Sequence, residues 1–146
     1  MNRVRTILTV LLGITMGSLF MVCTAANAEE ILVIANPNVP SDSLDRGVIS
    51  GIYHSRKAKW DNGDTILVAM LKKGVIHEKF ARNIAGSTPA KLKNIWKKVI
   101  FTGTGRPPKI FRQESDMVRF VADTKGAIGY ISASTPHEGV KVISIK

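Results

Sequence analysis

The side chains that most often do chemistry in proteins are sparse here, and they form no catalytic or metal-binding pattern. The three histidines, His54, His77 and His137, have no second ligand at metal-binding spacing, and the glutamates that directly follow two of them cannot share a helix face with them. The chain has no Gly-x-Ser-x-Gly elbow, its single cysteine is Cys23, and its carboxylates are few and scattered. We therefore expect no metal, no cofactor and no enzymatic activity.

Anion binding is better represented than catalysis. The segment 102–108 reads Thr-Gly-Thr-Gly-Arg-Pro-Pro, in which glycines allow backbone N–H groups to approach a ligand and Arg106 can form a fork with an oxyanion. Thr104 supplies a hydroxyl in the same stretch. The alternative is structural, because a helix often ends at a left-handed glycine with prolines soon after.

Predicted helix starts are the other places where backbone N–H groups are free to meet an anion. By composition they lie near 41–43, 87–88 and at Ser115, although each of these residues also serves as an ordinary cap. Four lysines lie on one face of the segment 91–98, which is either a solvated helix face or a docking patch.

Residues 1–28 have the parts of a secretory signal peptide. Arg3 and Arg5 precede an apolar run over 6–22 of about 17 residues, and Ala26-Asn27-Ala28 forms a small-x-small cleavage site. A retained membrane anchor or a lipidated Cys23 are the alternatives, but the run is short for a bilayer. We expect one domain over 29–146, not spanning a membrane, in the periplasm or outside the cell.

The composition of 29–146 is strongly basic. Of the 21 Lys and Arg residues, two lie in the predicted signal peptide, which leaves 19 against 11 acids and a net charge of +8. No basic, aromatic-rich motif of the nucleic-acid-binding kind is present, so we expect no nucleic-acid partner. Anionic small ligands, anionic envelope surfaces and acidic protein patches are the expected partners, or the charge simply keeps the protein soluble.

Hydrophobic patterning predicts the elements that would position these residues. Apolar runs predict buried strands over 31–35, which we expect to be parallel, and 66–71. Helical spacing predicts helices over 44–54, with its cap among 41–43 and His54 at its end, and over 75–84. Further elements are a helix from Thr88-Pro89 through 100, a short strand at 110–111, a helix over 116–123 capped by Ser115, and strands over 127–132 and 140–145. This order predicts an α/β fold with helices covering a sheet.

The order of motifs resembles the phosphate-type substrate-binding proteins of ABC transporters. The resemblance rests on "LDRGVISGIYHSRKAKW" (44–60) followed by Asn62-Gly63, on "STPAKLKNIWKKVIFTGTGRPP" (87–108), on "DMVRFVADTKGAIGYIS" (116–132) and on "GVKVISI" (139–145). It implies one type II lobe of the periplasmic binding-protein fold, with a mixed β-sheet flanked by helices. It also implies a non-enzymatic solute-binding function connected with phosphate transport, and a transport component of the envelope as a partner.

Two departures from that family bear on function. The full receptors close two lobes over the ligand, and this chain is too short for two such lobes. Their Ser-Gly-Thr loop is absent from the matching place, which reads Met70-Leu71-Lys72-Lys73-Gly74. By this resemblance, Lys72, Lys73, Gly74 and the helix start that follows are the candidate site for phosphate or another oxyanion, with Thr104 and Arg106 as further candidates. The alternative is an envelope protein-interaction module that has lost its small ligand and docks an acidic partner through its basic surface.

Overall fold

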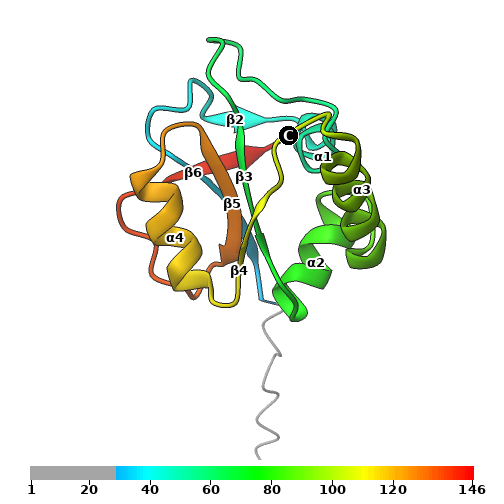
Figure 1. Cartoon of the computed structure of the whole chain (residues 1–146). Coiled ribbons are helices and arrows are strands. Elements are labelled where there is room, and N and C mark those ends of the chain that lie inside the picture. The colour runs from blue at the N-terminus through cyan, green and yellow to red at the C-terminus, as the bar shows by residue number, and fades with distance from the viewer. Residues whose placement is uncertain (1–28) are drawn as a thin grey trace, which may run out of the picture.

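The computed structural model describes residues 29–146, which form a mixed sheet covered by helices on both faces (Figure 1). The predicted signal peptide lies outside the described residues. The predicted order of elements is confirmed, with one additional short strand, β2. The elements are β1 (Ile31–Ala35), β2 (Ser43–Leu44), α1 (Arg46–Tyr53), β3 (Leu67–Leu71), α2 (Val75–Asn83), α3 (Pro89–Thr102), β4 (Lys109–Phe111), α4 (Glu114–Asp123), β5 (Ala127–Ser132) and β6 (Lys141–Ile145).

The sheet has six strands in the order β2-β6-β1-β5-β3-β4. Strands β3, β4 and β5 run parallel to one another, and β2 runs parallel to β6. The expected parallel pairing of β1 is wrong, because β1 pairs antiparallel with both neighbours, β5 and β6. Burial on both faces gives the same apolar run in either direction, so the sequence of 31–35 does not encode its direction.

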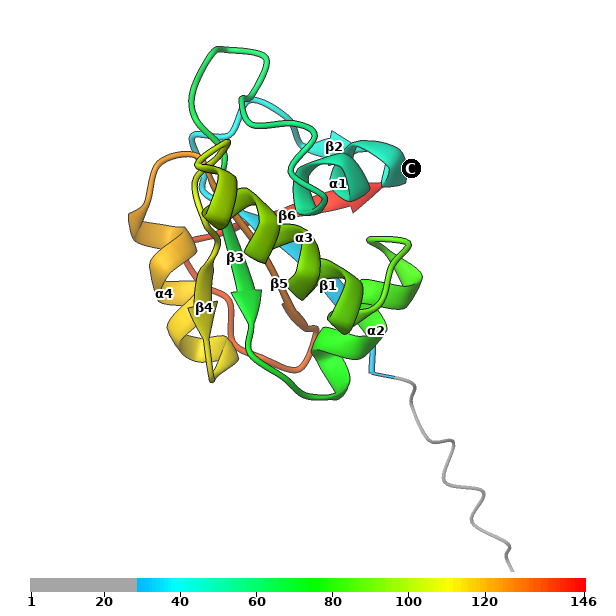
Figure 2. The same ribbon diagram turned by 45° about the vertical axis from the view of Figure 1, so that its right-hand side comes forward.

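Helix α4 covers one face of the sheet, and α1, α2 and α3 lie on the other (Figures 1 and 2). All six residues of β5, the strand between the two helical layers, are buried. On the α4 side, Met117 is fully buried and lies where a side chain at Gly129 would otherwise extend. On the other side Phe80 stacks on Tyr130, and Tyr53 meets Phe80 edge-on with ring centroids 4.6 Å apart.

Of the three helix caps expected from the sequence, the structure confirms one and corrects two. The caps expected among 41–43 are wrong, because Ser43 and Leu44 pair with β6 and α1 begins only after Asp45. The Ser115 cap is also wrong, since α4 starts at Glu114 after Gln113. The start of α3 is confirmed: the Thr88 hydroxyl accepts a hydrogen bond from the Lys91 N–H, and Pro89 occupies the first turn.

His54 is the C-cap residue of α1, as expected. Within 29–146, no helix is both long enough and apolar enough to cross a bilayer.

Candidate functional site

The carboxyl ends of β3, β4 and β5 meet at one edge of the sheet because the three strands are parallel. Helices α2 and α4 begin at that same edge, at the bottom of the molecule in Figure 1. In open α/β sheets this is the edge where ligands bind, since loops and helix N-termini converge there. Any solute site in this chain is therefore expected at this edge.

Three cations gather at the carboxyl edge. The pairing of Leu71 with Phe111 places the residues that follow them side by side, and the Lys72 N–H donates to the Phe111 carbonyl at 2.8 Å. Lys72, Lys73 and Arg112 line a hollow of about 410 Å³, which we call the basic hollow. Sequence reasoning missed Arg112, because only the β3–β4 register brings it beside the two lysines.

Gly74 connects this lysine pair to α2. Its φ of 116° lies in a region that side-chain-bearing residues avoid, and its carbonyl accepts the first helical hydrogen bond, from the Glu78 N–H. The cap makes no side-chain hydrogen bond, so the first N–H groups of α2 have no side-chain acceptor there. These donors add their partial positive charge to that of the lysines.

The cations of the basic hollow have no carboxylate partner in the described part of the chain. The ion pairs found within 29–146 involve Lys57, Lys125 and Lys141 instead. The pairs lie elsewhere in the structure, so no described carboxylate forms an ion pair with Lys72, Lys73 or Arg112.

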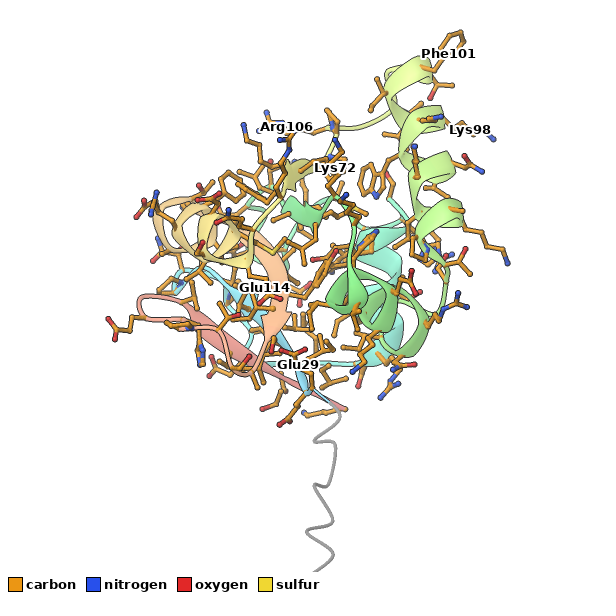
Figure 3. All side chains as sticks on the ribbon, turned by 90° about the horizontal axis from the view of Figure 1, so that it is seen from below. Glu29, Lys72, Lys98, Phe101, Arg106 and Glu114 are labelled. Carbon is orange, nitrogen blue, oxygen red and sulfur yellow. The ribbon has the colours of Figure 1, made fainter. Side chains whose placement is uncertain are left out.

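Two carboxylates at this edge bind to hydroxyl and N–H groups at the end of β5. Glu114 accepts hydrogen bonds from the Ser132 N–H at 3.3 Å and from the Thr135 hydroxyl. Glu29 accepts from the hydroxyls of Ser132 at 2.6 Å and Ser134 at 3.1 Å, and the Ser132 bond in particular lowers the pKa of Glu29. Figure 3 shows both glutamates on the other side of this edge from Lys72.

Tyr130 and His77 form a buried polar pair at the first turn of α2. The Tyr130 hydroxyl accepts a hydrogen bond from the Leu71 N–H at 3.0 Å and lies 2.5 Å from His77 Nδ1. Burial lowers the pKa of His77 and raises that of Tyr130. Both shifts favour the uncharged forms of the two side chains. The sequence signal for this pair is weak: one histidine and one tyrosine at positions that otherwise take apolar residues.

Thr104 and Arg106 lie at the other end of the β3–β4 pair. They precede β4, whereas Lys72 follows β3, and the two strands are parallel. Gly103 ends α3 in the left-handed conformation with φ 64°, as the structural interpretation of 102–108 requires. The Thr104 hydroxyl contacts the Thr102 hydroxyl at 2.9 Å. The structure thus keeps Lys72, Lys73 and Gly74 together and separates Thr104 and Arg106 from them.

Within residues 29–146, no group of three His, Cys, Asp or Glu side chains is placed to hold a metal ion.

Neither a protein-family model nor a curated protein sequence matches the chain. Solved structures do match. One, from Clostridium perfringens and described as a phosphate ABC transporter substrate-binding protein with bound phosphate, is 21% identical with a TM-score of 0.65, over 80% of this chain and 45% of that one.

Two further matches are an ABC-type phosphate transport receptor from Vibrio cholerae and PstS from Borrelia burgdorferi. The first is 18% and the second 11% identical, each with a TM-score of 0.63. They cover 80% and 81% of this chain, but only 47% of each of those chains. The chain therefore spans about half the length of the structures it matches, and it has the α/β fold of one lobe of the phosphate-type periplasmic binding proteins.

Proposed function

We propose that this chain is an exported, non-enzymatic solute-binding module that takes phosphate or another oxyanion in the basic hollow. The observation that carries the proposal is the convergence of Lys72, Lys73 and Arg112 at the start of α2, with no carboxylate partner among the described residues. The fold adds support, since its solved neighbours include a protein with bound phosphate. Export rests on the predicted signal peptide at 1–28.

The chemistry of the basic hollow sets the expected selectivity. The basic hollow has two flexible ammonium groups and one guanidinium, and the loop after β3 has no Ser-Gly-Thr hydroxyl donors. Lysine acts as a point charge, whereas arginine forms a directional fork. We therefore expect oxyanions to be distinguished mainly by charge, with phosphate and sulfate binding comparably.

Calorimetry of the purified protein with phosphate and sulfate at fixed ionic strength tests this proposal. We expect saturable heat that is lost in Lys73→Met and Arg112→Met. Lys98→Met removes another exposed lysine, from the far end of α3, and should bind as the parent does. Absence of heat at millimolar phosphate and sulfate would rule out the oxyanion receptor.

A second candidate function is docking of an acidic protein partner, such as an envelope transport component. Phe101 is 93% exposed at the end of α3, near the exposed Lys98 (Figure 3) and four residues after the exposed Lys97. An exposed aromatic ring next to cations suits an acidic partner with an apolar contact. Capture of a partner that is lost both at high salt and in Phe101→Ser would favour this function. Capture of a partner that is unaffected by high salt and by Phe101→Ser would count against it.

A further inference from the structure

A second, apolar concavity adjoins the basic hollow. It lies between α3 and the β3–β4 pair, holds about 420 Å³, and shares Lys72 with the basic hollow as a lining residue. Met70 and Ile110, which are paired neighbours in the sheet, line it together with Trp96 and Ile100 from α3. We call this concavity the apolar groove. Its volume falls within the range of sites that hold drug-sized ligands.

The polar side chains that line the apolar groove are three lysines, the largely buried His77 and Trp96. Besides Lys72, the groove is lined by Lys93 and Lys97, which are four residues apart on α3 and so project from the same side. Neither forms an ion pair within 29–146. The indole N–H of Trp96 is buried and has no hydrogen-bond partner among the described residues. An apolar surface with these neighbours complements a molecule with an apolar body and an anionic group.

Inorganic phosphate would occupy only the basic hollow. The apolar groove would stay exposed to water beside it, with Ile100 56% and Ile110 50% exposed. A substituent on the anion that filled the groove would remove this apolar surface from water.

We propose that the preferred ligand is an organic oxyanion, with its charged head in the basic hollow and an apolar substituent in the apolar groove. Lys72, which lines both concavities, would mark the junction between head and substituent. This inference rests on the proposed function, because it uses the same site for the head.

A small ligand fits the apolar groove better than an extended peptide does. The outer strand of the sheet beside it, β4, is only three residues long and follows Pro107 and Pro108. Proline cannot donate a backbone hydrogen bond, and short strands with lysine and proline resist the addition of another strand. A second copy of this chain would bring the same lysines together, so like charges disfavour it as the occupant.

A series of phosphonates on the purified protein tests the proposal. The probes are inorganic phosphate, methylphosphonate, phenylphosphonate and octylphosphonate, titrated at fixed ionic strength and below micelle-forming concentrations. Each methylene that leaves water adds affinity, so we expect octylphosphonate to bind at least about tenfold more tightly than methylphosphonate. Trp96 should report it by fluorescence, because the other tryptophan, Trp60, is buried elsewhere with its N–H bonded to the Gly126 carbonyl.

Variants distinguish the contribution of the apolar groove to affinity from that of the basic hollow. Ile100→Ser and Ile110→Ser change partly exposed side chains that line the groove, so the fold should tolerate them and the gain from the octyl group should disappear. Val142→Ser is the control, since Val142 is 41% exposed on β6 and does not line the groove. The gain should survive in that control.

The outcomes separate this inference from the proposed function. Equal affinities for phosphate, methylphosphonate and octylphosphonate would overturn the inference and leave the oxyanion site intact. Absence of binding by every probe would overturn both. Binding of neutral diethyl octylphosphonate as tightly as octylphosphonate would show that the groove takes apolar molecules without an anionic head, which also contradicts the inference.

Discussion

At the scale of single residues, removing the Tyr130 hydroxyl should lower the stability of the fold. It satisfies both the Leu71 N–H and His77 Nδ1, and the pair is buried. We predict that Tyr130→Phe lowers the free energy of unfolding by about 1–3 kcal/mol, because two buried groups lose their partner. Tyr53→Phe is the control: that hydroxyl makes one bond, to the Ala69 carbonyl at 3.2 Å, and should cost about 1 kcal/mol. Urea unfolding measures both, and equal losses would contradict the account.

His77 makes stability depend on pH in a defined direction. Its pKa is lowered in the fold by burial, whereas an unfolded histidine titrates at about 6.5. Below that pH the unfolded state binds more protons, so folding stability falls as the pH drops from about 6.5 towards the lower pKa of the folded state. We predict that His77→Gln flattens this dependence in urea unfolding at about pH 5.5 and 7.5. A parent protein equally stable at both values would contradict this prediction.

At the scale of elements, the turn into β5 depends on a glycine. Gly126 has a φ of 78°, a side chain there would lie 2.3 Å from the Thr65 carbonyl oxygen, and its own carbonyl accepts from Trp60 Nε1 at 3.0 Å. We predict that Gly126→Ala destabilises the protein by about 3 kcal/mol or more. Gly47→Ala in α1, where nothing lies within 4 Å, should stabilise it by up to about 1 kcal/mol. Thermal unfolding of the two variants in parallel tests this contrast.

Periodicity and cap residues predicted most elements because each of these signals is local. The strand 127–132 and the helix that starts at Thr88 and ends at Gly103 were predictable from their own residues. The Ser115 cap is wrong by one or two residues at a helix boundary, whereas the other two errors depend on distant partners. Ser43 is a strand residue because β6 lies beside it, and β1 is antiparallel because of where β5 and β6 run.

At the scale of the whole molecule, three of the four residues of the candidate site were named from the sequence: Lys72, Lys73 and Gly74, but not Arg112. Lys72, Lys73 and Gly74 are contiguous and occupy the place of the family's Ser-Gly-Thr loop, so the resemblance grouped them. Arg112 joins them only through the register of β3 with β4, and Arg106 is excluded only because β4 runs parallel to β3. Both depend on how β3 and β4 pair in the folded protein, and a single sequence does not contain that pairing.

Because the basic hollow is open to solvent, we predict that its affinity for oxyanions depends on the salt concentration. The chain spans about half of the receptors it matches, and its three site cations are exposed. Screening should therefore weaken oxyanion binding steeply between about 0.01 M and 1 M ionic strength, where the screening length falls from about 30 Å to about 3 Å. Calorimetric titration with phosphate in sodium chloride of each strength measures it. Affinity that is independent of salt would argue for a closed, desolvated site instead.

The central claim is that an oxyanion binds where α2 begins, and amide NMR during a phosphate titration tests it most directly. We predict saturable shifts of the backbone amides of Gly74, Val75 and Arg112, with the amides of Thr104 and Arg106 unmoved, since the latter lie at the other end of β3 and β4. Saturable shifts confined to 103–106, or no saturable shift at all, would contradict the account.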